Sequence, residues 1–286
     1  MSNADKPMGI DHSFIKQRMV SDERLVPSNV ALAWALMEDI QETLASAAQP
    51  FDIYNETWKL FALYYGARIY GAFGATIAVL FHTFGREASY LDRALYELFT
   101  KLLYYTTLHE RAREALDGFP RSHVKFMRKL SIEPAKLLSP EQLKVVEGAS
   151  VYNTDEQFTK MHAELLKDER FKQSAHKPAV KQYLNDPAGQ WHLRWVIPSQ
   201  VVHGTIVDLF ASSPIDLDRP EITGELNSER PSPNAALLRA VQDALYTAVH
   251  IEGEFGLAQA SGRSMIESGL KKALETVDTD DGLANA

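Results

Sequence analysis

Apolar residues recur at helical spacing along most of the chain and outline a series of helices. In residues 29–48 they lie three or four positions apart, at Val30, Ala33, Trp34, Met37, Ile40 and Leu44. This spacing places one apolar stripe along a helix and leaves polar side chains on the other face. Pro27 and Ser28 provide an entry turn, and Pro50 ends the segment. We therefore expect the first long helix over residues 29–48.

The next helix, expected over residues 54–84, is apolar around its whole circumference. Its segment 61–81 is long enough to cross a bilayer, and Arg68 is the only charged residue within it. Placing that arginine in hydrocarbon costs about 2.5–3.5 kcal/mol on insertion scales. Several tyrosines also fall inside the segment and not at its ends, where membrane helices place them. The pattern therefore favours a buried central helix of a soluble bundle over a membrane span.

Residues 86–114 form the clearest amphipathic pattern of the chain. Leucines centre one face of the expected helix, at Leu91, Leu95, Leu98 and Leu102. A polar stripe occupies the opposite side, formed by Arg86, Tyr90, Arg93, Glu97 and Lys101. The leucine face is expected to pack inward.

Start signals and periodicity predict further helices, and no alternating strand pattern is present. Ser139-Pro140 and the capping box Thr154 to Gln157 begin two of them. Others are expected near 179–184, over 191–211 with a kink at Pro198, and over 235–276 with a bend at one of its glycines. The fold class is therefore all-α, a bundle of seven to nine helices without significant sheet.

The same pattern predicts how the chain is organised. Residues 1–27 form a polar N-terminal arm without the features of a secretory signal. Residues 28–276 form a single helical-bundle domain, which contains a proline-rich loop at 212–234. Residues 277–286 are expected to be an acidic, disordered tail.

Composition narrows the functional classes. The 286-residue chain has no cysteine, which excludes disulfides and thiolate chemistry and fits a reducing compartment, so we expect a cytoplasmic protein. Its net charge of −8 argues against coating nucleic acid over a wide surface. The densest basic region spans residues 109–129 and contains Arg111, Arg113, Arg121, Lys125, Arg128 and Lys129. Runs of this kind are usually solvated helix faces.

Two polar pairs are the best candidates for chemistry. Arg93 and Glu97 are spaced i, i+4 on one expected helix, and Ser199 and His203 have the same spacing on another. Arg93 could bind phosphate, with Glu97 orienting it, and His203 could act as an acid or base beside Ser199. The alternatives are a surface ion pair for the first and a hydrogen-bonded core histidine for the second.

Other established site types lack their signatures in this sequence. Neither a glycine-rich phosphate loop nor an H-E-x-x-H motif occurs, and E-x-x-H pairs of the di-iron type are missing too. The nine histidines are scattered along the chain. We therefore expect no metal site and no cofactor.

The two pairs also carry a resemblance. Arg93-Ala-Leu-Tyr-Glu97 followed by Ser199-Gln-Val-Val-His203-Gly204 resembles an uncharacterised bacterial family of helical proteins, over about residues 55–255. Its members have an R-x-x-x-E helix in the first half and an S-x-x-x-H helix in the second. More distantly, the chain is similar to HEPN helical proteins, which place an R-x4–6-H motif at a dimer interface to cleave RNA. Here Arg170 and His176 have that spacing, but Phe171 follows the arginine where a polar residue is usual.

Two hypotheses follow. The resemblance implies an RNA- or nucleotide-processing protein that forms a homo-oligomer, with Arg93, Glu97, Ser199 and His203 at its site. The alternative is a non-catalytic helical binding or dimerisation module, in which the polar pairs only set helix register. The first requires Arg93 and His203, from different helices, to meet in one open cleft.

Overall fold

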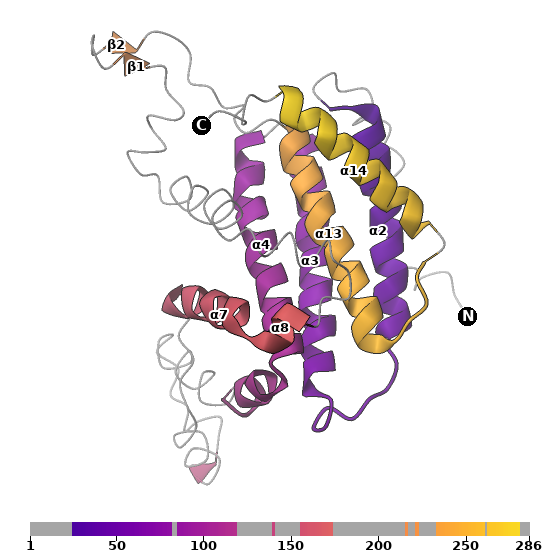
Figure 1. Cartoon of the computed structure of the whole chain (residues 1–286). Coiled ribbons are helices and arrows are strands. Elements are labelled where there is room, and N and C mark those ends of the chain that lie inside the picture. Colours follow the sequence, from indigo (N-terminus) through magenta and orange to yellow (C-terminus); the bar gives the residue numbers. More distant parts are fainter. Residues whose placement is uncertain are drawn as a thin grey trace.

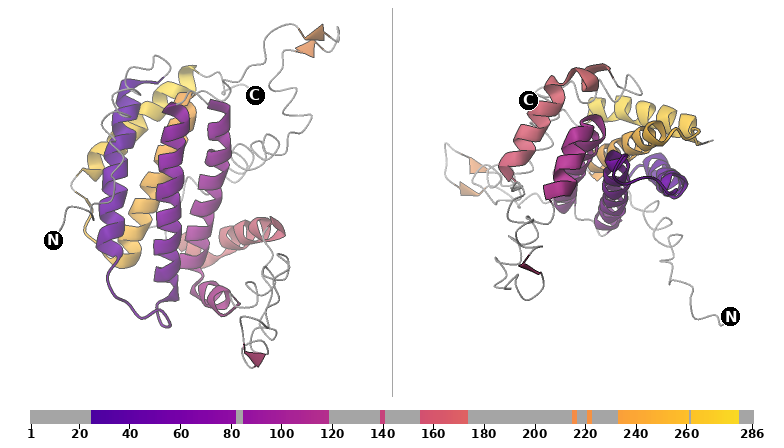
Figure 2. Two further views of the ribbon diagram at one scale, coloured as in Figure 1. Left: turned by 180° about the vertical axis from the view of Figure 1, so that it is seen from behind. Right: turned by 90° about the horizontal axis from the view of Figure 1, so that it is seen from below.

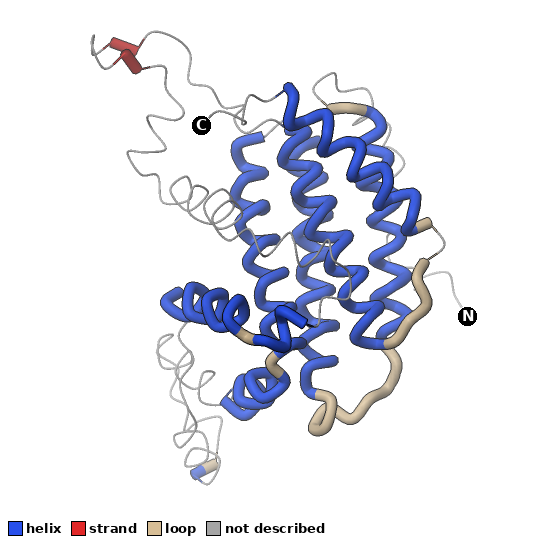
Figure 3. The backbone as a smooth tube through the Cα atoms, in the orientation of Figure 1, coloured by secondary structure: helices blue, strands red, loops and turns tan. Residues whose placement is uncertain are grey.

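The described part of the chain is almost entirely helical (Figures 1 and 3). The computed structural model describes residues 25–81, 85–118, 139–140, 155–173, 215–216, 221–222, 233–260 and 262–280. Its helices are α2 (Pro27–Ala47), α3 (Thr57–Phe81), α4 (Gly85–Thr107), α7 (Asp155–Lys167), α8 (Glu169–Gln173), α13 (Pro233–Phe255) and α14 (Arg263–Asp280). The strands β1 (Ile215–Asp216) and β2 (Glu221–Ile222) form one short antiparallel pair. The all-α class predicted from the sequence is confirmed.

Four helices, α2, α3, α4 and α13, stand side by side as a bundle (Figure 1). A hydrogen bond of 2.9 Å from the Val26 backbone N–H to the Asn234 side-chain oxygen ties the start of α2 to the start of α13. These two helices and α4 run in one direction, and α3 runs in the other. Helix α14 leans across α2 and α13, while α7 crosses α4 at a steep angle (Figure 2).

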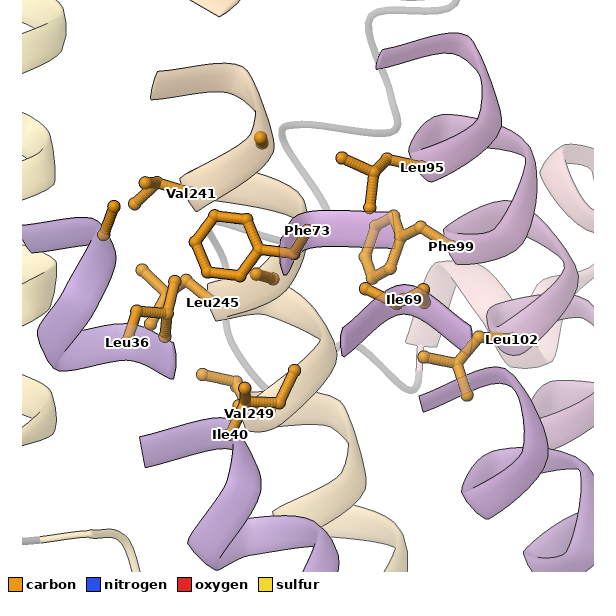
Figure 4. Packing of buried hydrophobic residues seen from close by; sticks show 14 of the residues in the cluster. Leu36, Ile40, Ile69, Phe73, Leu95, Phe99, Leu102, Val241, Leu245 and Val249 are labelled. Carbon is orange, nitrogen blue, oxygen red and sulfur yellow. The ribbon is translucent and has the colours of Figure 1, made fainter. Parts of the chain in front are cut away.

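One continuous apolar core fills the space between the four helices (Figure 4). Each helix contributes buried side chains to it: Leu36 and Ile40 from α2, Ile69 and Phe73 from α3, Leu95, Phe99 and Leu102 from α4, and Val241, Leu245 and Val249 from α13. Burying one such side chain contributes about 1.5–3 kcal/mol. The leucine face predicted for residues 86–114 accordingly packs inward, with Leu95 and Leu102 fully buried.

Helix α13 lies at the centre of the bundle, whereas α3 leaves one of its faces exposed. Helix α13 packs against α2, α3, α4 and α14. By contrast, α3 buries one side and leaves the other in solvent, at Tyr64, Ala67, Arg68, Gly71, Ala75 and Ala78. The expectation of a buried central helix at 61–81 is therefore wrong for that outer side. Its outer residues are mostly small and uncharged, so their pattern in the sequence resembles that of core residues.

Two helices that the periodicity predicts as continuous are interrupted in the structure. Helix α4 ends at Thr107, and a second helical segment, 109–118, follows Leu108. Thr106 donates its hydroxyl to the Leu102 carbonyl at 2.8 Å, a side-chain bond that weakens helices. The predicted helix over 235–276 is divided where Gly256 adopts a φ of 61°, a left-handed conformation that ends α13.

The edges of the bundle differ slightly from the expected domain limits. Leu25, within the predicted N-terminal arm, is buried in the core. Helix α14 continues to Asp280, into the segment 277–286 expected to be a tail. Between Gly269 and Gly282 the chain contains no glycine or proline, so the backbone can continue as a helix past residue 277. Among the described helices, none has the length and apolar character needed to cross a membrane.

Gly66 marks the closest approach of α3 to its neighbours. A Cβ atom at this position would lie 2.6 Å from Ile251 Cδ1 of α13 and 2.8 Å from Leu44 Cδ2 of α2. Both distances are shorter than van der Waals contact, so the absence of a side chain lets three helices meet here. At Gly71, five residues along α3, a Cβ would meet nothing within 4 Å.

These two glycines form a matched pair of stability tests. Gly71→Ala should raise the free energy of unfolding by about 0.5–1 kcal/mol, because alanine favours the helix and the space is open. Gly66→Ala gains the same propensity but forces Ile251 and Leu44 to move, at about 1–3 kcal/mol. Urea unfolding should place Gly66→Ala at least about 1 kcal/mol below Gly71→Ala. Equal stability of the two variants would show that the helices are not tightly packed at Gly66.

Candidate functional site

The polar stripe of α4 lies at a helix–helix seam. Glu97 pairs with Lys101, and their side chains are 27% and 21% exposed. Arg93, one turn earlier, is half-buried. The ion partner found for Glu97 is thus Lys101, whereas the sequence suggested Arg93. A glutamate four residues before a lysine is the favourable order for such a pair in a helix.

Helix α7 covers this stripe. The Lys101 ammonium lies 6.0 Å from the ring centre of Phe158, which is fully buried on α7. Cation–aromatic contacts of this kind favour a partly desolvated lysine. Arg93, Glu97 and Lys101 are therefore partly buried, whereas Tyr90 of the same stripe is exposed.

A buried imidazole lies in the same seam. The Tyr96 hydroxyl and His162 Nε2 are 3.0 Å apart and form a hydrogen bond, and both side chains are buried. Burial lowers the pKa of His162 from 6.5 to about 4, because desolvation disfavours the charged ring. His162 is therefore neutral near pH 7. Tyr96, the residue that contacts the imidazole, lies three residues after Arg93 on α4.

His162 was missed by the sequence analysis. The capping box at Thr154 predicted this helix, but the histidine within it received no role. The signal was present, because Phe158, His162 and Leu165 follow helical spacing and share the buried side of α7. A histidine within such an apolar stripe is a candidate for a neutral, hydrogen-bonded core residue.

Carboxylates already pair with the arginines of the helical segment 109–118, which follows α4. Glu164 of α7 accepts a hydrogen bond from the Tyr104 hydroxyl at 2.8 Å and another from Arg111 Nε at 2.9 Å. Arg111 also donates to Glu114 at 2.7 Å, and Arg113 to Asp117 at 3.1 Å. The described part of the predicted basic region is thus largely neutralised. Arg121, Lys125, Arg128 and Lys129 lie outside the described residues.

Arg170, the arginine with HEPN-like spacing, is also occupied. Its two terminal nitrogens donate to the two carboxylate oxygens of Glu110 at 2.9 and 2.7 Å, and Asp168 accepts further bonds. The Arg170 guanidinium lowers the pKa of Glu110 to about 2. Such forked geometry is also what binds phosphate, so a phosphate ligand would have to displace Glu110. His176 lies outside the described residues.

Only two of the four predicted site residues lie in the described part of the chain. Arg93 and Glu97 lie on α4 at its seam with α7, whereas Ser199 and His203 lie outside the described residues. Whether Arg93 and His203 meet therefore stays a prediction.

A second polar seam joins α4 to α13. Asp92, which is buried, accepts a hydrogen bond from Arg239 Nε at 2.8 Å. About three to four turns further along these helices, Thr106 Oγ1 and His250 Nε2 are 2.6 Å apart, and Glu254 lies 3.7 Å from the same nitrogen. Thr106 already donates to the Leu102 carbonyl, so His250 donates to Thr106. Both carboxylate and hydroxyl thus face one ring nitrogen, which differs from a catalytic triad, where they contact opposite nitrogens.

Comparisons with known proteins give no further assignment. No family model matches the chain, and no curated protein or solved structure is similar to it. Within the described ranges, no three histidine or acidic side chains are grouped so that they could hold a metal ion. Function must therefore be inferred from the residues and contacts of this chain.

The depressed pKa of His162 predicts a loss of stability in acid. Between pH 6.5 and 4 the unfolded chain binds a proton at this histidine and the folded protein does not, so unfolding becomes easier as pH falls. The effect should reach on the order of 3 kcal/mol near pH 4.

Urea unfolding of wild type and His162→Gln at pH 7 and pH 4.5 measures this effect. At pH 7 both side chains are neutral, so that comparison reports the cost of altered packing alone. The wild type should then lose more stability than the variant on going to pH 4.5. Parallel losses in the two proteins would mean that His162 does not resist protonation in the folded state.

Proposed function

We propose that this chain is a helical binding module whose docking surface is the outer face of α3, and that its partner is a second copy of the chain. One observation carries the proposal: the exposed residues Tyr64, Ala67, Gly71, Ala75 and Ala78 form a continuous stripe at helical spacing. From residue 60 to the end of α3, Arg68 is the only charged residue. Surface helices of globular proteins normally expose charged and polar side chains, and exposed apolar surfaces mark interaction sites.

The small size of the stripe residues fits a helix as the partner. Alanine and glycine let two helix backbones approach closely, so van der Waals contact extends along the whole interface. At Gly71 the space above the backbone is open, with nothing within 4 Å of a would-be Cβ. This glycine serves no packing purpose within the described bundle, and it lowers the stability of its own helix. A partner helix over this position would explain why the residue is small.

The order of the stripe residues fits a second copy. Their positions are symmetric about Gly71, because Tyr64 and Ala78 lie seven residues on either side and Ala67 and Ala75 lie four. Two α3 helices crossing antiparallel on a twofold axis at Gly71 would place each tyrosine opposite an alanine of the partner. Closed twofold dimers use one self-complementary patch in this way.

A cytoplasmic location, which we also propose, is supported by the absence of cysteine.

Placing a charge at the proposed axis tests this dimer. Gly71→Glu sets two carboxylates against each other, so light scattering behind a sizing column should show a mass near 32.1 kDa, against twice that for the wild type. Lys271→Glu, on the exposed side of α14, is the matched control and should leave the dimer intact. A wild type that is monomeric at high micromolar concentration, or a Gly71→Glu variant that dimerises normally, would rule the interface out.

RNA or nucleotide processing of the HEPN type is a second candidate. It is supported by the half-buried position of Arg93, because a partly buried cation suits phosphate binding better than a fully solvated one. In this proposal Arg93 binds phosphate and Glu97 orients it. His203 is the acid–base group, and Ser199 positions it. The same twofold dimer could provide the oligomer that this class of protein uses.

Cleavage of a labelled single-stranded RNA by the purified protein tests this second candidate. Arg93→Ala and His203→Ala should each reduce the cleavage rate at least about 100-fold, as expected for a lost phosphate contact and a lost acid–base group. Lys160→Ala, an exposed residue on α7, is the control and should retain full activity. If wild type and His203→Ala are equally inactive or equally active, the catalytic role is excluded and the binding module stands alone.

A further inference from the structure

One fully buried arginine joins three helices of the bundle. Arg263, the first residue of α14, has no exposed side-chain surface. Its Nε donates to Asp39 Oδ2 of α2 at 2.9 Å. Its two terminal nitrogens donate to Glu252 of α13 at 3.2 and 2.9 Å, so the Glu252 contact is forked. Thr43 of α2 lies at 3.5 Å from the same group.

The charges in this cluster do not balance. Among the described residues, one guanidinium faces two buried carboxylates, and Glu42 and Glu267 approach Asp39 from α2 and α14, so negative charge is in excess. Asp39 Oδ1 is buried and has no hydrogen-bond partner among the described residues. Burial is the main cause that raises the pKa of Asp39, with Arg263 acting in the opposite direction. The cluster therefore depends on its single cation, because removing that charge would leave two buried anions.

Without this cluster α14 would be a weak helix. A cation at the N-terminal end opposes the helix dipole, and the first turn of α14 contains no acidic residue. Gly269, in the helix interior, further lowers helix propensity. Helix α14 contributes two buried apolar side chains to the core, Ile266 and Leu270, and two partly buried ones, Ala273 and Leu274. The other four long helices share a far larger core.

We infer that α14 is a strap, held across α2 and α13 by Arg263, that opens as a unit while the four-helix bundle stays folded. Figure 1 shows α14 lying obliquely over these two helices, and its first residue, Arg263, makes the contacts to Asp39 and Glu252. A Cβ on Gly269 would lie 3.1 Å from Leu32 Cδ1 of α2, so the strap packs closely against α2. Opening would expose the surface of α2 near Leu32. The strap lies on the opposite side of the bundle from α3 (Figure 2), so this inference is independent of the proposed dimer.

Hydrogen exchange of the intact chain, read peptide by peptide by mass spectrometry, tests the strap. In Arg263→Met, amides of residues 264–275 should exchange about 100-fold faster at pH 8, as expected when a buried ion pair loses one partner. Amides of α3 and α4 should keep their protection. Acceleration of all five long helices together would overturn the inference, because α14 would then belong to one cooperative unit. Unchanged exchange in α14 would overturn it as well.

A pH comparison separates the ion cluster from ordinary packing. In Arg263→Met the two carboxylates can take up protons in acid, so the loss of protection in α14 should be much smaller at pH 5 than at pH 8, after correction for intrinsic rates. Ile266→Ala weakens the same helix through an apolar contact, and its effect should be the same at both pH values. A pH-independent effect of Arg263→Met would mean that the residue acts through packing.

Asp39→Asn provides a variant that keeps the cation. It removes the excess negative charge and leaves the forked Arg263–Glu252 pair, so α14 should be protected at least as well as in the wild type. If Asp39→Asn opens the strap as far as Arg263→Met does, the charge-imbalance explanation is wrong. The comparison of Asp39→Asn with the wild type still tests the inference if Arg263→Met does not fold at pH 8.

Discussion

The bundle depends on burying α13 among its neighbours. This helix contacts α2, α3, α4 and α14, and its apolar side chains occupy the centre of the core. It also carries buried polar residues, among them His250 and Glu252. Because a buried polar group without a partner is costly, each neighbouring helix has to present a suitable group at the right height. That requirement fixes the register of α4 through Thr106 and that of α14 through Arg263.

The same requirement separates the molecule into regions with different properties. The α4–α7 seam holds a neutral imidazole and a half-buried ion pair, whereas carboxylates pair with the arginines of the segment 109–118. The outer face of α3 has almost no charge. The phosphate site proposed around Arg93 and the docking surface proposed on α3 use different helices of the bundle and are compatible with one another.

Helix α14 differs from the rest of the bundle in what holds it. The four central helices are joined by wide apolar contacts, which change little with pH or salt. In contrast, α14 combines a narrow apolar stripe with one buried cation between two anions. Interactions of that kind are strong when complete and strongly unfavourable when a partner is lost. A protein that needs one element to move independently could use this difference, because the rest of the core is not involved.

Local sequence patterns determined the helices of this protein but not their surroundings. The 3.6-residue periodicity predicted α2, α4 and the inward leucine face, because an amphipathic stripe is a property of one helix alone. It could not tell that α3 exposes a face and α13 does not, since burial depends on how many neighbours a helix acquires. Likewise, Glu97 and Lys101 are neighbours on one helix and could be paired from the sequence, whereas Arg263 and Asp39 are separated by 224 residues. Contacts of that length exist only once the helices have packed, so the tertiary structure alone decided them.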